Sequence, residues 1–172
     1  MKKWLFLILL FPLICVAQTY RYLGVEDGLS NRRVYCIQKD KTGYMWFLTH
    51  EGIDRYNGKE FKRYKLMDGD AEVNSLLNLN WLYIDQEGVL WEIGKKGKVF
   101  RYDQIHDCFS LVYKLPMESF SEQPDPVTYA WLDQNKHIWL CNKDTIFLYN
   151  TDTKQVTHIK NDISEEIRSE EH

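Results

Sequence analysis

Hydrophobic and polar positions follow one pattern in three separate stretches of the chain. In each stretch an apolar run is followed by a short polar turn and then by a second apolar run, and the stretches begin at Val34, Leu79 and Val127. The runs are rich in β-branched and aromatic residues, which favour the pleated surface of a strand. Self-similarity at a period of tens of residues is typical of repeat architectures built from one small unit. The pattern therefore predicts three copies of an antiparallel β-unit.

Three kinds of anchor residue fix the register of the copies. An aspartate precedes a tryptophan by six residues in each copy, and the tryptophans recur at intervals of 45 and 48 residues. A tyrosine follows each tryptophan by ten or eleven residues. Four short strands in a unit of this length are typical of one blade of a β-propeller. The anchors are Asp40, Asp85 and Asp133, then Trp46, Trp91 and Trp139, and finally Tyr56, Tyr102 and Tyr149.

The turns between the first two strands support this interpretation. Aspartate suits the first position of a type I turn and glycine the last, and Gly43 and Gly88 stand at that last position in the first two copies. The third copy has Lys136 there. Asn135 stands just before it and tolerates the left-handed backbone conformation, so we expect this turn to form as well.

The strand after the first turn is apolar on both of its faces. Alternation along the strand puts Trp46 and Leu48 on one face and Met45 and Phe47 on the other. A strand with two apolar faces has to be covered on both sides. Small antiparallel sheets stacked face to face meet that requirement, as they do in a propeller.

The repeat divides the chain into parts. We expect a leading strand at 19–23, three four-stranded blades at about 30–66, 75–115 and 126–160, and a polar tail, or a linker to a missing blade, at 161–172. The segment 67–78 is expected to be a linker, and a second linker precedes the third blade. Propellers close with about four to eight blades, so this is an incomplete, open propeller. The chain is then a fragment, a truncated reading frame or part of an assembly.

The first residues have the pattern of a targeting segment. Lys2 and Lys3 precede an apolar run over 4–17, and these 14 residues are too few to span a bilayer comfortably. Small residues before Gln18 predict cleavage there, which makes 1–17 a signal peptide of an exported, periplasmic protein. Lipidation at Cys15 and an uncleaved anchor are the alternatives.

Composition and charge narrow the function classes. Hydrophobic residues make up 44% of the chain and charged residues 27%, which indicates a globular domain. A net charge of −3 without a basic patch gives no reason to expect nucleic acid as a partner. Beyond Cys15 an odd number of cysteines remains, Cys36, Cys108 and Cys141. We expect them to be small buried hydrophobes, although an exported chain could oxidise two of them.

Residues able to do chemistry mostly have a structural explanation. The repeated aspartates are expected to shape turns, and the repeated tryptophans to lie in the core, as are Trp81 and Trp131. The acidic segment 68–79 resembles a calcium loop, but it has Val73 and Leu79 where that loop needs glycine and glutamate. His106 near Cys108 lacks a second pair for zinc. We therefore expect no catalytic residue, metal or cofactor, and the sequence assigns no ligand-binding residue.

The first copy resembles a known repeat, the two-component-regulator propeller repeat. The second and third copies match more loosely, with Gly94 and Asn142 in place of Thr49. The resemblance extends over about 19–160. In the first copy the matching residues are Gly28, Leu29, Ser30, Asn31, Val34, Ile37, Asp40, Gly43, Trp46, Thr49, Gly52, Arg55, Gly58 and Phe61.

A signal peptide followed by such repeats is similar to the start of the hybrid two-component receptors of glycan-degrading gut bacteria. The resemblance implies a periplasmic sensor region with two seven-bladed propellers and a β-sandwich, which binds oligosaccharides. It also implies an inner-membrane helix, a histidine kinase and a DNA-binding region in the parent protein, and a possible homodimer. This chain contains no kinase motif.

The expected function is therefore a fragment of a periplasmic, glycan-sensing propeller that serves signal transduction and transcriptional regulation in its parent protein. Missing blades or a second copy would complete the ring. A propeller enzyme, such as a polysaccharide lyase or glycosidase, is one alternative, and it requires acids that converge on the innermost strands. A non-catalytic interaction scaffold is the other.

Overall fold

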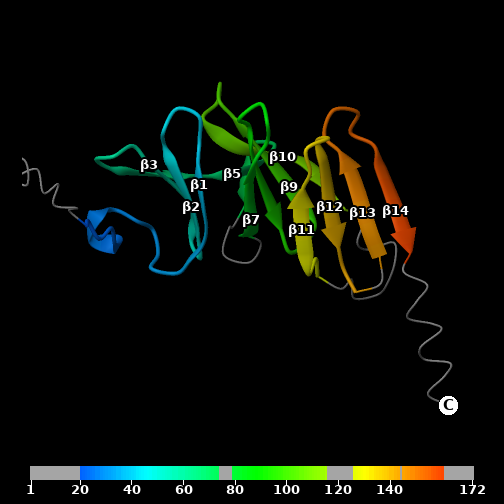
Figure 1. Ribbon diagram of the computed structural model, residues 1–172, viewed down its shortest axis with the longest axis horizontal. Helices are drawn as coiled ribbons and strands as arrows, with labels where there is room; N and C mark the ends of the chain where they lie inside the picture. Colours follow the sequence, from blue (N-terminus) through cyan, green and yellow to red (C-terminus); the bar gives the residue numbers. More distant parts are fainter. Residues whose placement is uncertain (1–19, 74–78, 116–125, 144, 161–172) are drawn as a thin grey trace, which may run out of the picture.

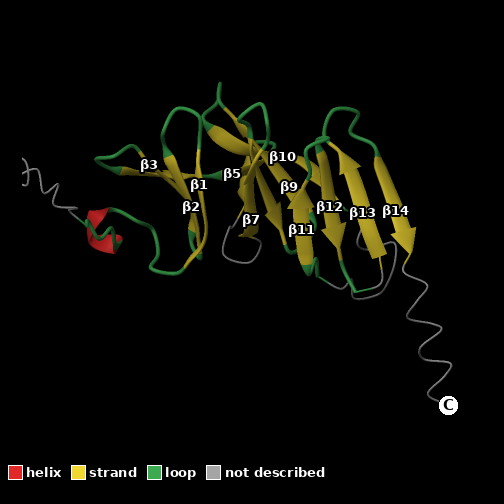
Figure 2. Ribbon diagram, in the orientation of Figure 1, coloured by secondary structure: helices red, strands yellow, loops and turns green. Residues whose placement is uncertain are grey.

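The computed structural model describes residues 20–73, 79–115, 126–143 and 145–160 of the 172-residue chain. Strands dominate this part, and its single helical element is the 3-10 turn η2 (Val25–Asp27), drawn red in Figure 2. The predicted signal peptide at 1–17 and the predicted tail at 161–172 lie outside the described residues.

The strands form three sheets that lie side by side along the molecule (Figure 1). The first and third sheets are four-stranded antiparallel meanders in chain order. The first consists of β1 (Val34–Lys39), β2 (Met45–Thr49), β3 (Gly52–Tyr56) and β4 (Phe61–Tyr64). The third consists of β11 (Tyr129–Leu132), β12 (His137–Cys141), β13 (Thr145–Asn150) and β14 (Val156–Lys160).

The second sheet has two strands more than the others. It contains an antiparallel meander of four strands, β7 (Leu79–Ile84), β8 (Leu90–Gly94), β9 (Lys98–Asp103) and β10 (Cys108–Lys114). The short hairpin of β5 (Leu66–Asp68) and β6 (Ala71–Val73) extends this sheet at its outer edge, where β5 runs parallel to β10.

The structure describes residues 67–73 of the predicted linker at 67–78. The prediction is wrong there, because these residues belong to the β5–β6 hairpin. Leu66 explains why, because its side chain is buried in the core between the first two sheets and Leu66 pairs with Phe109 on β10. Only Lys65 separates the last strand of the first sheet from the first strand of this hairpin.

Two hydrophobic cores hold the three sheets together. Trp46, Leu48 and Ile53 of the first sheet pack against Leu82 and Phe100 of the second. The opposite face of the second sheet packs against the third through a second cluster, which contains Trp91, Ile93, Val99, Leu115, Val127, Ala130, Leu132, Ile138, Leu140, Phe147 and Tyr149. The first strands β1, β7 and β11 lie next to one another, with β7 in contact with both others.

Each blade therefore presents its tryptophan to the blade that follows. Trp46 is 1% exposed and Trp91 is also buried, so the prediction that they lie in the core is confirmed. Trp139 is only half-buried, because it faces away from the second sheet and no described residue stacks over that face. Trp131 lies on the same face and is 51% exposed, so its predicted place in the core is wrong. Trp81 is half-buried at the edge of the second core.

The turn between β11 and β12 of the third blade forms, but the residue in the left-handed conformation is not the one expected. Lys136, and not Asn135, adopts the left-handed conformation, with φ of 63°, where Gly43 and Gly88 have φ of 92° and 91°. The Lys136 ammonium group pairs with Glu87 at 2.6 Å and with Asp152 at 3.3 Å. Since Glu87 belongs to the second blade, this lysine also connects two blades.

The prediction of a leading strand at 19–23 is wrong for residues 20–23, which the structure describes. Residues 20–23 do not form a strand, and the side chains of Tyr20 and Tyr22 are exposed. A strand requires a neighbouring edge to satisfy its backbone groups, and no described strand offers one at this place. The chain then turns through η2 and passes over the outer face of the first blade.

The architecture is all-β, an open propeller of three blades stacked face to face. No helix among the described residues is long and apolar enough to cross a membrane.

Candidate functional site

The turn between the first two strands of each blade is held by its aspartate. The indole nitrogen of Trp46 donates to Asp40 Oδ2 at 2.8 Å, and Trp91 and Trp139 donate to Asp85 and Asp133 at 2.9 Å each. In the first turn Asp40 Oδ1 also accepts the backbone N–H groups of Thr42 and Tyr44. Burial opposes ionisation of Asp40, but these hydrogen bonds outweigh it and lower its pKa. The predicted turn role of the aspartates is confirmed, and each of them also fixes an indole ring.

These turns form the rim of a cleft between the first and second blades. The cleft has a volume of about 700 Å³, within the range of about 300–1,000 Å³ that is usual for ligand pockets. Three turns line it, the β1–β2 turn of the first blade and the β7–β8 and β9–β10 turns of the second. The lining residues are Asp40, Lys41, Thr42, Tyr44, Trp46, Arg55, Glu87, Gly88, Val89, Leu90, Arg101, Tyr102, Asp103, Gln104, Ile105, Ser110 and Val112.

Arg55 is one of the charged residues that line this cleft. Its guanidinium carbon lies 4.6 Å from the ring centre of Tyr44, 5.2 Å from that of Tyr64 and 5.5 Å from that of Trp46. The ring faces stabilise the cation, and no carboxylate in the described part of the chain forms an ion pair with it. Arg55 is half-buried. It is therefore a positive charge that keeps hydrogen-bonding capacity for a ligand.

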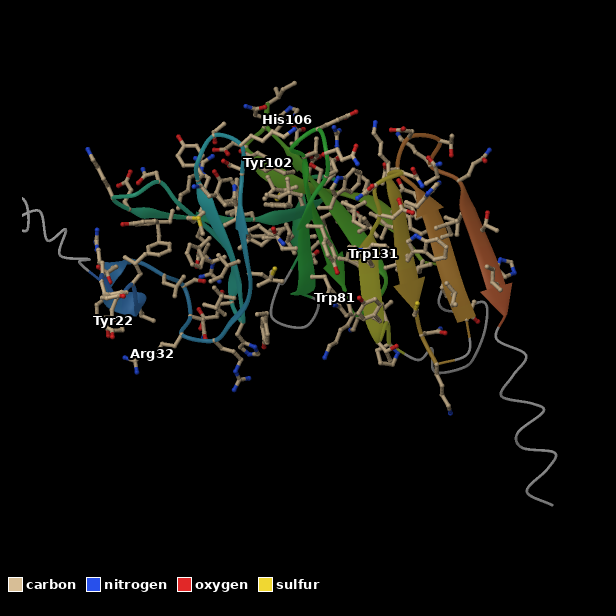
Figure 3. All side chains as sticks on the ribbon, viewed as in Figure 1. Tyr22, Arg32, Trp81, Tyr102, His106 and Trp131 are labelled. Atoms are coloured by element: carbon tan, nitrogen blue, oxygen red, sulfur yellow. The ribbon has the colours of Figure 1, made fainter. Side chains whose placement is uncertain are left out.

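The second blade contributes a tyrosine and an aspartate at the same end. Tyr102 donates its hydroxyl to Asp107 at 2.6 Å, and Lys62 of the first blade pairs with the same carboxylate. Burial together with this bond raises the pKa of Tyr102 to about 12. Desolvation opposes ionisation of Asp107, but the Lys62 and Tyr102 bonds lower its pKa to about 2. The carboxylate is therefore ionised at neutral pH and links the two blades. Figure 3 shows Tyr102 and the nearby His106 at the upper end of the molecule.

A smaller cleft of about 290 Å³ lies between the second and third blades. Arg101 occupies the position in β9 that Arg55 has in β3, opposite the blade tryptophan, and lies 5.8 Å from the ring centre of Trp91. Glu87, Lys136 and Asp152 also line this cleft, and they neutralise one another through ion pairs. The first cleft is thus the larger of the two.

The Gly28–Asn31 motif has a structural role on the other side of the first blade. The Ser30 backbone N–H donates to Asp54 Oδ2 at 2.8 Å, and its hydroxyl lies 2.7 Å from that of Thr49. Asn31 donates to Glu51 at 3.1 Å. Asp54 is fully buried, and burial raises its pKa. The motif therefore fastens the N-terminal segment to the outer face of the blade.

The acidic segment and the cysteines considered in the sequence do not form a metal site or a disulfide among the described residues. The acidic stretch at 68–72 belongs to the β5–β6 hairpin, and in the described residues no group of three or more His, Cys, Asp or Glu side chains could hold a metal ion. Cys36, Cys108 and Cys141 are free thiols and half-buried, so no disulfide forms among them. Neither Arg55 nor its cleft was predicted as a site from the sequence. The available signal was the recurrence of an arginine before the closing tyrosine in the first two blades.

The enzyme alternative needs acids on the innermost strands. None of β1, β7 and β11 contains an aspartate or a glutamate. The acids that line the larger cleft come from turns, and one of them, Asp40, is bound to Trp46.

Comparison with known proteins finds one matching family model, in the first blade. The model of the two component regulator propeller matches residues 28–51, which run from the Gly28–Asn31 motif to the end of the β2–β3 turn. No curated protein matches the chain.

Solved structures are similar over most of the chain. The extracellular domain of the proposed hybrid two component system BT3049 from B. thetaiotaomicron is 28% identical with a TM-score of 0.62, and the match covers 81% of this chain and 20% of that one. The extracellular domain of the proposed hybrid two component system BT4673 from the same organism has a TM-score of 0.63 at 20% identity, over 84% of this chain and 19% of that one.

The chain thus spans about a fifth of the length of the solved domains that it matches. Its first blade has the family motif and its three blades have the fold of those extracellular domains. Residues 28–51 thus match the two component regulator propeller repeat, and the three blades are similar to the extracellular domains of hybrid two component systems.

Proposed function

We propose that the chain is part of a periplasmic sensor that binds an oligosaccharide, and that in its parent protein this binding controls a histidine kinase and transcription. The observation that supports this most directly is the similarity of 81% of the chain to the extracellular domain of a hybrid two component system. The receptor would be exported by a signal peptide and anchored in the inner membrane.

The cleft between the first and second blades is the proposed binding site. Aromatic side chains and a few polar groups are what a sugar requires, since rings stack on its apolar face and polar groups bind its hydroxyls. Tyr44 and Tyr102 supply rings, and Arg55 supplies a cation without a carboxylate partner among the described residues. A planar guanidinium binds carboxylates and sulfates through paired hydrogen bonds. We therefore expect an acidic oligosaccharide in preference to a neutral one.

A ligand in this cleft would touch two blades at once, and this could be the origin of the signal. The first blade lines the cleft with residues of the β1–β2 turn, β2 and β3, and the second blade lines it with residues between β7 and β10. A ligand shifts a conformational equilibrium only by its differential affinity for the two states. Binding that favours one spacing of the blades would meet that condition.

Calorimetry with a panel of neutral, uronic-acid-containing and sulfated oligosaccharides tests the proposal on the full chain. We expect heat of binding with an acidic member and a loss of at least tenfold in affinity for Arg55→Gln. Lys59→Gln removes an exposed charge in the β3–β4 turn and is the matched control, with unchanged affinity.

Three results would count against the proposal. If no saccharide gives heat with a folded chain, the interaction scaffold is favoured. If new reducing ends or unsaturated products appear during incubation with polysaccharides, the chain is an enzyme. If Lys59→Gln weakens binding as much as Arg55→Gln, the site lies elsewhere.

A further inference from the structure

The two clefts between the blades share part of their lining. Glu87, Arg101 and Val112 of the second blade line both the cleft toward the first blade and the cleft toward the third. Glu87 lies in the β7–β8 turn, while Arg101 and Val112 lie on β9 and β10. These elements belong to the middle one of the three sheets that lie side by side in Figure 1. The two clefts therefore adjoin at the second blade.

Each cleft contains an arginine at the same position of the repeat. Strand pairing puts Arg55 opposite the tryptophan of the first blade and Arg101 opposite that of the second. Among the described residues neither guanidinium forms an ion pair with a carboxylate. Arg101 is exposed, and the third blade has Leu148 at this position. The two arginines are thus equivalent cations, one blade apart.

The carboxylates that line the two clefts already have partners. The turn aspartates of the first two blades each accept the indole N–H of their own tryptophan. Glu87 and Asp152 share the ammonium group of Lys136, at 2.6 Å and 3.3 Å. Asp103 Oδ2 lies 2.6 Å from Nδ1 of His106. An anionic ligand would therefore meet two arginines that have no carboxylate partner, and carboxylates that other groups already bind.

The spacing of the two arginines limits the kind of ligand. Equivalent positions in sheets stacked face to face lie about 10 Å apart, which is about the length of a disaccharide. Acid groups on every second sugar of a linear oligosaccharide therefore repeat at nearly the spacing of Arg55 and Arg101. Each planar guanidinium binds one carboxylate or sulfate through paired hydrogen bonds.

We propose that the two clefts form one extended site, in which Arg55 and Arg101 bind two acid groups of the same linear oligosaccharide, one disaccharide apart. Arg101 is then a specificity-determining residue for the length and the charge spacing of the ligand. This inference rests on the proposed function and adds the second cleft to it. Because one molecule makes both contacts, the second contact forms at a high effective concentration, and affinity rises steeply once the ligand is long enough.

Calorimetry of the full chain with two series of acidic oligosaccharides tests the proposal. The probes are oligogalacturonates and hyaluronan fragments of two, four and six sugars, and in both series the longer members have carboxylates one disaccharide apart. In at least one series the tetrasaccharide should bind at least about tenfold more tightly than the disaccharide, because it reaches both arginines. The hexasaccharide should add less than about threefold, because a third arginine is absent from the repeat position.

Arg101→Gln tests the second contact. It should weaken binding of the tetrasaccharide by about 10- to 100-fold, to about the affinity of the disaccharide, since a charge-assisted pair of hydrogen bonds is lost. Binding of the disaccharide should change by less than about threefold. Arg55→Gln should weaken both. Lys96→Gln is the matched control, because it removes an exposed charge in the β8–β9 turn at the other end of the same blade.

Thr151→Trp tests the second cleft without changing either arginine. Thr151 lines the second cleft and is not among the residues that line the first. An indole at this position would fill the smaller cleft, so the tetrasaccharide should lose its advantage in affinity. An unchanged affinity for the disaccharide shows that the variant is folded and that its first cleft is intact.

The outcomes separate this inference from the proposed function. Equal affinities of the disaccharide and the tetrasaccharide would confine binding to the first cleft and overturn the inference alone. A gain with length that survives Arg101→Gln or Thr151→Trp would put the second contact elsewhere and overturn it as well. Binding of neutral oligosaccharides only would refute the inference and leave a sugar sensor. The absence of heat with every saccharide would refute both.

Discussion

The indole nitrogen of Trp91 donates to Oδ2 of Asp85 across 2.9 Å, and the other oxygen of that carboxylate accepts the backbone N–H of Val89 at 2.8 Å. One side chain thus shapes the turn and also sets the direction of the ring that fills the core between the second and third blades. The same pair occurs in all three blades, so the aspartate and the tryptophan act as one unit.

Replacing Asp85 with alanine should lower the free energy of unfolding by about 2–3 kcal/mol, because a charged acceptor of two hydrogen bonds is lost. Urea unfolding followed by circular dichroism measures the change. Asp70→Ala is the control, since Asp70 is exposed in the β5–β6 turn, and it should change stability by less than about 0.5 kcal/mol. Equal losses in the two variants would show that the Asp85 bonds do not stabilise the blade.

Trp91 and Trp139 occupy the same repeat position with different burial. Truncating a buried tryptophan to alanine costs about 3–5 kcal/mol, and this is the loss expected for Trp91→Ala, which removes a core side chain. Trp139→Ala should cost at most about half as much, because one side of its ring is open. Chemical denaturation at a concentration where the chain is monomeric makes the comparison. A Trp139 variant as unstable as the Trp91 variant would contradict the open face.

Gly97 and Gly69 both have left-handed backbones, with φ of 68° and 60°. A Cβ at Gly97 would lie 2.7 Å from Leu115 Cβ, whereas a Cβ at Gly69 would meet nothing within 4 Å. Gly69→Ala should therefore cost only the backbone strain of about 1–2 kcal/mol, and Gly97→Ala should cost about 1–3 kcal/mol more through overpacking. Thermal and urea unfolding of the two variants check the difference. Equal stabilities would mean that Leu115 moves aside without cost.

Asp54 should make stability depend on pH. Burial raises the pKa of Asp54 in the folded state above the ordinary value of an aspartate, so the folded chain holds its proton more tightly than the unfolded chain does. The resulting stabilisation is present at low pH and is lost as the pH rises through the folded pKa. Asp54→Asn keeps an oxygen for the Ser30 N–H but has no charge. From about pH 4 upward its stability should therefore rise relative to that of the wild type.

The measurement is the free energy of unfolding at several pH values between about 4 and 8 for both proteins. Asp54→Ala serves as the second variant, because it removes the charge and also the acceptor for Ser30, and it should be less stable than Asp54→Asn throughout. Parallel curves for the wild type and Asp54→Asn would refute a raised pKa.

The repeat was predictable from the sequence because its anchors are local. Asp40 and Trp46 are six residues apart, and turn chemistry with strand alternation is sufficient to place both. The exposure of Trp131 was not predictable, since a strand has the same pattern whether or not another sheet covers it. The β5–β6 hairpin was missed because its strands of three residues are too short to show alternation. Arg55 became a candidate only when the structure put three rings around it.

Lys65 is the single residue between a strand of the first sheet and a strand of the second. The borders of the sequence repeat and the borders of the sheets therefore do not coincide. A fragment that begins after residue 65 would keep the hairpin together with the second sheet, to which β5 is hydrogen-bonded. A crossover inside the 74–78 segment would instead leave the second sheet without the hairpin at its outer edge. The segment that keeps the second sheet whole therefore runs from Leu66 to Lys114 and begins one residue after the first sheet ends.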